Sequence, residues 1–189
     1  MKLYEDPNDF LQAKWKHAFY IFFDLNYNDF IDWNDFVTLM NLIELARGKH
    51  SDEYLTAKFC LTEVWDSMTE ALDMQHDDKI CLTDWISMWT KSMTLSKAPA
   101  WQKAYVEYIF KLLDASGDKL VDQAEYVQVL GYFGVPKTTA LWCFDKFAID
   151  DTGHPVHSID YRRFLQLWKE FFTSTDVNAR GNFLLGEIT

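Results

Sequence analysis

The stretch DASGDKLVDQAE, residues 114–125, decides how the rest of the chain is interpreted. Oxygen-bearing side chains stand at its places one, three, five, nine and twelve, and an apolar residue, Val121, stands at place eight. Phe110 and Leu113 precede it with helical spacing, and Tyr126 follows it. The pattern indicates an acidic loop between two helices, with alternate residues turned inward.

That spacing fits the needs of a hard divalent cation. Ca²⁺ prefers about six to eight oxygen ligands at ~2.3–2.6 Å, and a twelve-residue loop supplies them from places one, three, five, seven, nine and twelve. Place seven gives its backbone carbonyl, and place nine often holds a water molecule. The predicted ligands are Asp114, Ser116, Asp118, the carbonyl of Leu120 and Glu125, with Asp122 holding a water.

Residues 24–35, DLNYNDFIDWND, align on the same grid. Place six is Asp29 instead of Gly, and Asp is among the residues that best tolerate a positive φ after Gly. The closing Asp35 is one methylene shorter than Glu, which favours a contracted six-coordinate site and so also accepts Mg²⁺. The alternative is a polar turn. The predicted ligands are Asp24, Asn26, Asn28, the carbonyl of Phe30 and Asp35, with Asp32 acting through water.

Residues 73–84, DMQHDDKICLTD, form a third candidate. Gln75 is long for place three, and Cys81 at place nine is a poor ligand for a hard cation, so water must serve there. Mg²⁺ is again plausible, and the alternative is a vestigial loop. The predicted ligands are Asp73, Gln75, Asp77, the carbonyl of Lys79 and Asp84.

The fourth loop, at about residues 150–163, is predicted to be degenerate. It is longer than the other three, and Pro155 with two histidines interrupts the ligand sequence. Arg163 stands where the closing carboxylate belongs, and a guanidinium repels a dication. His154 and His157 are interpreted as loop histidines, although a transition-metal pair is the alternative. We therefore expect three calcium ions and none at Arg163.

The long segments between these loops carry helical periodicity, so we predict an all-α fold. A helix, loop, helix unit recurs four times, and the units pair into two lobes of a compact globule through short strands between loops. One lobe is expected to span residues 1–95 and the other, with a C-terminal tail, residues 96–189. The expected helices cover 8–23, 33–47, 51–72, 82–94, 99–113, 123–133, 137–149 and 160–174.

Composition restricts the function. The formal net charge of −11 opposes nucleic-acid binding, which needs basic patches. No apolar run is long enough for a transmembrane segment, and the N-terminus lacks the features of a signal peptide. The three cysteines match no zinc site and are interpreted as reduced thiols. We expect a cytoplasmic monomer, and no catalytic constellation is readable, so we expect no enzyme.

The loops resemble those of the EF-hand superfamily over nearly the whole chain, and more narrowly those of sarcoplasmic calcium-binding proteins and calexcitin-like proteins. In chain order, loop one is 24–35, loop two is 73–84 and loop three is 114–125. Three features carry the likeness: the unequal loop starts at 24, 73 and 114, the closing Asp of loops one and two, and the stretch FAID before the degenerate loop. It implies neuronal calcium signalling with a protein target such as an ion channel. GTP binding and phosphorylation are also implied.

Three functional interpretations remain open. A calcium sensor exposes apolar surface to a target, whereas a calcium and magnesium buffer fills with little opening. The 15 Phe, 9 Tyr and 8 Trp outnumber the 6 Met, which favours a closed core. A GTP-binding switch would use GYFGVPKT, residues 131–138, but Pro136 replaces the second Gly of a phosphate loop and offers no N–H. The apolar tail GNFLLGEIT either completes a core or occupies a target groove.

Overall fold

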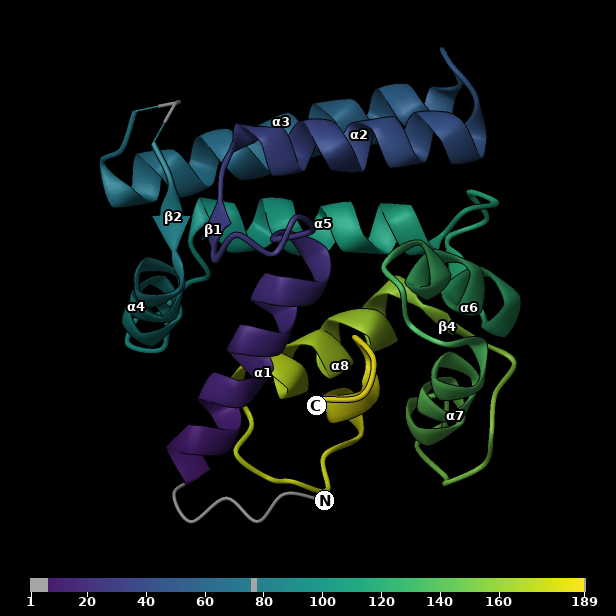
Figure 1. Cartoon of the computed structure of the whole chain (residues 1–189). Coiled ribbons are helices and arrows are strands. Elements are labelled where there is room, and N and C mark those ends of the chain that lie inside the picture. The colour runs from purple at the N-terminus through teal and green to yellow at the C-terminus, as the bar shows by residue number, and fades with distance from the viewer. Residues whose placement is uncertain (1–6, 76–77, 189) are drawn as a thin grey trace. The chain divides into compact units, whose positions relative to one another are not determined.

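The computed structural model describes residues 7–75 and 78–188, and within them the expected all-α fold is confirmed. The described residues form eight α-helices, two pairs of short strands and one 3₁₀ helix, η1, and most of these elements are labelled in Figure 1. In chain order the elements are α1 (Pro7–Phe22), β1 (Phe30–Ile31), α2 (Trp33–Arg47), α3 (Asp52–Leu72), β2 (Ile80–Cys81), α4 (Leu82–Ser92), α5 (Ala100–Leu113), β3 (Leu120–Asp122), α6 (Gln123–Tyr132), α7 (Lys137–Phe147), β4 (Ser158–Asp160), α8 (Tyr161–Thr173) and η1 (Arg180–Phe183).

The chain divides into two compact units. Residues 18–112 form one, called here the N-unit, and residues 113–189 with the segment up to His17 form the other, called the C-unit. The sequence predicted lobes of 1–95 and 96–189, which hold the same pairs of loops. The observed units differ in that α5 groups with the first two loops and most of α1 groups with the last two.

The loops pair within each unit through antiparallel strands, at the apolar place-eight residues. In the N-unit, Ile31 on β1 faces Ile80 on β2, and both side chains are fully buried. In the C-unit, Val121 on β3 faces Ile159 on β4. Because neighbouring strands bring their backbones within about 5 Å, each pairing fixes two loops to each other.

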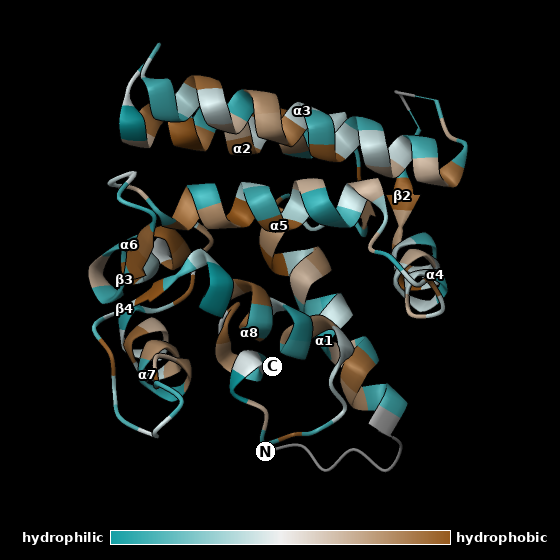
Figure 2. Cartoon of the chain, turned by 180° about the vertical axis from the view of Figure 1, so that it is seen from behind, coloured by the Kyte–Doolittle hydropathy of each residue, from teal (hydrophilic) through white to brown (hydrophobic). Residues whose placement is uncertain are grey.

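Capping residues set where the helices of the N-unit begin and end. Gly48 ends α2 with a φ of 94°, and the hydroxyl of Ser51 accepts a hydrogen bond from Tyr54 N at 3.0 Å to start α3. The tight turn places α2 and α3 side by side, with α5 running along them in the same unit (Figure 1). Hydrophobic and hydrophilic bands alternate along α3 and α5 (Figure 2), as amphipathic helices require.

An interlocking set of aromatic rings fills the N-unit core. The ring of Phe23, next to the first loop, lies 5.6 Å from Trp85 and 5.0 Å from Tyr105 between centroids. Trp89 meets Trp101 edge to face at 4.8 Å. Such tilted pairs add about 0.5–1.5 kcal/mol each beyond the area they bury. The helix entering loop one and the helix leaving loop two therefore share one rigid core.

In the C-unit, the apolar face of α8 is core, and it does not form a free surface helix. Phe164, Leu167 and Phe171 are fully buried, and Trp168 packs against Phe172 with the rings tilted by 42° and their centroids 4.5 Å apart. No helix among the described residues is long and apolar enough to cross a membrane. The stretch 131–138 begins inside α6 and ends in α7. Gly131 therefore lies within a helix, whereas a phosphate loop requires a strand before its first Gly.

The C-terminal tail packs into the same core. Leu184 and Leu185 are fully buried, and the hydroxyl of Tyr126 donates to the carbonyl of Phe183 at 3.0 Å. His17 Nε2 lies 2.9 Å from the carbonyl oxygen of Leu185, which can only accept, so this nitrogen carries the hydrogen. Burial lowers the pKa of His17, and the hydrogen bond to Leu185 opposes that shift. In this structure the tail completes a core.

A buried ammonium group joins α1 to the tail. Lys14 Nζ donates to the carbonyl of Ser174 at 2.6 Å and to Asn182 Oδ1 at 3.0 Å. Loss of hydration on burial lowers the Lys14 pKa to about 8, and the carboxylates of Glu170 and Asp176 oppose that shift. The N-terminal helix and the tail are therefore held by charge-assisted hydrogen bonds.

A single glycine allows η1 to approach α8. A β-carbon on Gly181 would collide with the carbonyl oxygen of Leu167 and the backbone nitrogen of Phe171. Gly181→Ala should lower the free energy of unfolding by about 1–3 kcal/mol, measured by urea denaturation. Gly131→Ala is the control, because Gly131 is helical with open space around it and the change should be neutral or stabilising. Equal effects of the two changes would contradict this view of the tail.

Candidate metal centres

Loops one and three share one backbone conformation. Place four has a left-handed φ in both, 57° at Tyr27 and 75° at Gly117, and so has place six, 66° at Asp29 and 69° at Lys119. A non-glycine residue in this region costs roughly 1–2 kcal/mol. The absence of Gly at place six therefore did not prevent the turn in either loop.

The first-place and fifth-place side chains shape both loops through matching hydrogen bonds. Asp24 Oδ2 accepts from Asp29 N at 3.0 Å, and Asp114 Oδ2 accepts from Lys119 N at 3.1 Å. At place five, Asn28 Oδ1 and Asp118 Oδ1 accept from the backbone N–H two residues further on, at 3.0 and 2.8 Å. These hydrogen bonds fold the side chains at places one and five back onto the backbone of their own loop.

The closing carboxylate reaches back across each loop. Asp35 and Glu125 each accept from the backbone N–H of place nine at 3.0 Å. Toward place three, the longer Glu125 reaches the backbone N–H of Ser116, whereas Asp35 meets only the side-chain amide of Asn26, both at 2.8 Å. The missing methylene thus shortens the reach of Asp35. Asn26 must turn its amide for its oxygen to face an ion.

Loop one concentrates buried negative charge. Asp24, Asp32 and Asp35 are 0%, 8% and 1% exposed. Burial raises the pKa of Asp35 to about 6, and the neighbouring carboxylates of Asp32 and Asp24 raise it further, while Lys79 opposes them. Carboxylates held together away from water need a cation, so the donor set fits Ca²⁺ or Mg²⁺.

Loop three also contains a buried carboxylate oxygen that lacks counter-charge. Asp114 Oδ1 is buried and has no hydrogen-bond partner among the residues that the structure describes. Burial also raises the pKa of Asp114. An unsatisfied carboxylate oxygen at the first ligand place is what a calcium ion would satisfy, so this loop fits the ion as well.

The described part of loop two shares one closing bond with the other two loops. Asp84 Oδ2 accepts from Cys81 N at 3.0 Å, the same closing bond as in loops one and three. The Cys81 thiol also donates to this oxygen at 2.8 Å. In the first half Asp73 is exposed with a φ of 54°. The predicted ligand Asp77 lies outside the described residues.

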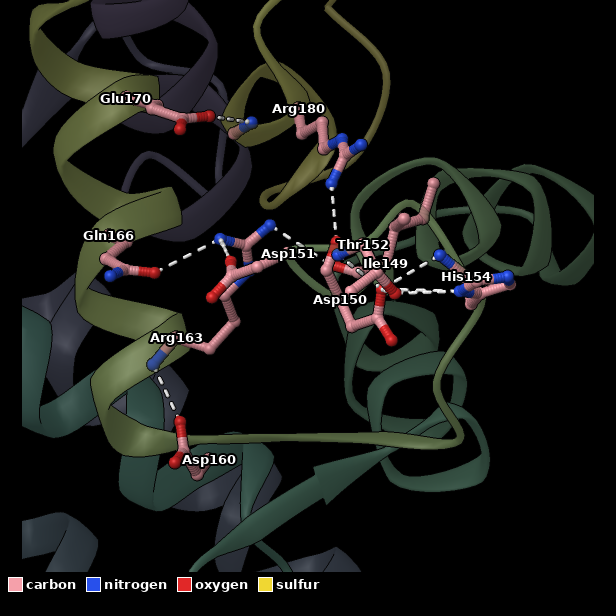
Figure 3. Close-up of polar contacts among 11 residues, drawn as sticks. Ile149, Asp150, Asp151, Thr152, His154, Asp160, Arg163, Gln166, Glu170 and Arg180 are labelled. Carbon is pink, nitrogen blue, oxygen red and sulfur yellow. Dashed lines mark hydrogen bonds and ion pairs between the residues drawn. The ribbon is translucent and has the colours of Figure 1, made fainter.

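The fourth loop is closed by guanidinium groups (Figure 3). The strand register aligns Ile159 with Val121, which places Arg163 at the closing position, as the sequence predicted. Its Nη2 donates to the carbonyl of Ile149 at 3.1 Å, and its Nη1 lies 3.7 Å from the Asp151 carboxylate. Arg180 Nη1 donates to the carbonyl of Asp150 at 3.3 Å. Positive charge thus faces the oxygens at the start of this loop.

The opening carboxylate of the fourth loop is satisfied by its own turn. Asp150 Oδ1 accepts from the hydroxyl of Thr152 at 2.7 Å and from His154 N at 2.9 Å. These bonds lower the pKa of Asp150 to about 2. His154 Nδ1 lies 2.7 Å from the Thr152 hydroxyl, so this histidine takes part in the turn itself.

Taken together, the described residues hold oxygen ligands in conformations ready to close in two of the four loops. Within residues 7–75 and 78–188, no three carboxylate, imidazole or thiol groups converge into a finished metal site. In loops one and three, backbone N–H groups satisfy most of the carboxylate oxygens instead. The sequence interpretation missed the ammonium of Lys79 beside Asp32 and the reach of Arg180. The pairing of place-eight residues could have revealed the first of these contacts.

Comparisons with known proteins agree with this geometry. No family model matches the chain. Calexcitin-1 of Caenorhabditis elegans is 30% identical over 188 residues, covering 100% of this chain and 92% of the relative. Sarcoplasmic calcium-binding proteins II, V, VI and VII of Branchiostoma lanceolatum are also 30% identical over 188 residues, covering 95% of this chain and 98% of theirs.

Solved structures give the same result. A sarcoplasmic calcium-binding protein from amphioxus superposes with a TM-score of 0.75 at 26% identity, covering 94% of this chain and 97% of that one. The coelenterazine-binding protein of Renilla muelleri, with a TM-score of 0.70 at 17% identity over 98% of this chain and 99% of that chain, shares the fold. The expected EF-hand likeness is confirmed.

The raised pKa of Asp35 predicts a pH dependence for the metal-free protein. Its pKa rises from 3.8 to about 6, so the folded state binds this proton more tightly than the unfolded chain. Its contribution to stability is present below pH ~4 and is lost as the pH rises through ~6. Asp35→Asn should therefore stabilise the metal-free protein at pH 7 by on the order of 1–3 kcal/mol relative to the wild type. Urea denaturation at several pH values tests this. The difference in free energy of unfolding between Asp35→Asn and the wild type should become smaller as the pH falls, and a difference that does not shrink would contradict the prediction.

The guanidinium of Arg163 predicts a stability contribution of its own. Arg163→Met keeps the aliphatic stem but leaves the carbonyl of Ile149 without this donor, at a cost of about 1–3 kcal/mol. Arg162→Met is the matched control, since Arg162 is exposed on the same helix. Chemical denaturation of the metal-free proteins measures the free energy of unfolding of each variant. An equal decrease in Arg163→Met and Arg162→Met would refute the role given to Arg163.

Proposed function

Because the chain belongs to the sarcoplasmic calcium-binding protein and calexcitin family of EF-hand proteins, we propose that it binds calcium and acts as a calcium sensor. One observation carries the proposal: loops one and three adopt the same inward-folded conformation around carboxylates that lack enough counter-charge. Calcium would neutralise those carboxylates and complete their coordination.

We propose three calcium ions, one in each of the loops 24–35, 73–84 and 114–125. Loops one and three are supported by their shared inward-folded conformations, whereas loop two is supported only by the closing bond from Cys81 N to Asp84. Loop two is therefore the weakest of the three. The shorter closing carboxylates Asp35 and Asp84 favour Mg²⁺ as a competitor in the N-unit, whereas Glu125 gives loop three its full reach.

The sensor proposal rests on a connection between loop three and the tail. Glu125 closes the loop and Tyr126 follows it directly on α6. Since the Tyr126 hydroxyl donates to the carbonyl of Phe183, a movement of Glu125 toward an ion reaches the tail through one residue. We propose that this movement exposes apolar surface to a protein target such as an ion channel, in a cytoplasmic protein without catalytic activity.

A buffer is the second candidate, and the composition of the core favours it. Met40, Met68 and Met88 are buried, so these methionines do not form a flexible surface. Interlocked rings resist the opening that a sensor requires, so calcium would bind with little change of shape. Such a protein would also accept Mg²⁺ in its contracted loops.

Calorimetric titration of the metal-free protein with calcium, with and without magnesium, tests these proposals. We expect three ions for the wild type and two each for Glu125→Gln and Asp35→Asn, because each change removes a closing carboxylate. Asp151→Asn, in the fourth loop, is the control and should still bind three. A dye for exposed apolar surface, added to the same samples, separates the alternatives: a sensor increases the signal on calcium, and a buffer does not. Retention of three ions by Glu125→Gln would contradict the site assignment.

A further inference from the structure

The strand pairing places a lysine of one loop opposite a ligand-bearing residue of the other. Phe30 faces Cys81 and Ile31 faces Ile80, so the next antiparallel pair is Asp32 opposite Lys79. Asp32 holds place nine of loop one, and Lys79 holds place seven of loop two. The predicted role of Lys79 uses only its backbone carbonyl, which leaves its side chain unassigned.

The side chain of Lys79 reaches the first loop. Its Nζ lies 3.7 Å from Asp32 Oδ2 and 5.5 Å from the centroid of the Phe30 ring. The Asp32 side chain is 11% exposed, and that of Lys79 is 54% exposed. The ammonium therefore stands at the solvent edge of the buried carboxylate group of loop one and supplies part of its counter-charge.

An ammonium at this point acts against a metal ion. It stabilises the metal-free carboxylates, and it repels a dication that approaches the same group. Because Lys79 is partly exposed, water and salt weaken both effects, so they change affinity without preventing binding. The same residue should give its carbonyl to an ion in loop two, and such an ion would fix its backbone.

The C-unit provides a natural comparison. There Asp122, the place-nine residue of loop three, faces Ser158 across the strands. Ser158 is neutral and occupies the position that Lys79 has in the N-unit. At the strand position that faces place nine, loop one therefore meets an ammonium group and loop three meets a neutral hydroxyl group.

We propose that Lys79 sets the calcium affinity of loop one and links it to loop two. This inference rests on the proposed calcium binding of loop one. Its ammonium weakens loop one relative to loop three, so loop three fills first as calcium rises. An ion in loop two then positions Lys79 through its carbonyl and alters the charge that loop one meets.

Exchanging the two facing residues tests the inference. Lys79→Ser is combined with Glu125→Gln, which removes calcium binding by loop three. Ser158→Lys is combined with Asp35→Asn, which removes calcium binding by loop one. Calcium titration is carried out at pH 8, well above the Asp35 pKa of about 6. At low ionic strength we expect Lys79→Ser to tighten loop one and Ser158→Lys to weaken loop three, each on the order of threefold to tenfold.

Two controls separate charge from structure. Lys79→Arg keeps the positive charge and should leave the affinity of loop one unchanged. Both affinity changes should shrink at high ionic strength, because salt screens partly exposed charges. An unchanged or weaker loop one in Lys79→Ser, with the ion count preserved, overturns the inference alone. A loop one that takes up no calcium in either lysine or serine form overturns the proposed function and the inference together.

Discussion

Carboxylates that are buried side by side need positive charge next to them, and the structure of this protein depends on how each loop meets that need. In loop one three aspartates are almost completely buried. In loop three one buried carboxylate oxygen lacks a partner among the described residues. Both loops hold these groups with backbone N–H donors, which supply only partial charge. We propose that a divalent cation supplies the remaining charge in both loops, which share one geometry although their sequences differ.

The remaining loops meet the same need with groups of their own. Arg163 and Arg180 face the carbonyls at the start of the fourth loop, so that loop is closed without an ion. In loop two the Cys81 thiol donates a hydrogen bond to the closing carboxylate of Asp84. The strand pairing couples each incomplete loop to a complete one. The fourth loop thus serves as a fixed strand partner for loop three.

Much of this arrangement follows from sequence, because periodicity and loop spacing are local properties. All eight expected helices formed, and their observed bounds lie within three residues of those expected. Asp114 and Glu125 lie where a twelve-residue grid places them. The grid gave no sign that Asp73 would adopt a left-handed conformation, because that depends on how α3 ends. Nor did it show Lys79 beside Asp32 or Arg180 beside Asp150, since both contacts join residues that are distant in sequence.

A crystal structure of the protein grown with saturating calcium tests the central claim most directly. The account predicts an ion in loop 24–35 bound by Asp24 and Asp35, another in loop 114–125 bound by Asp114 and Glu125, and Arg163 still donating to the carbonyl of Ile149. Two empty loops at saturating calcium, or an ion seated beside Arg163, would contradict it.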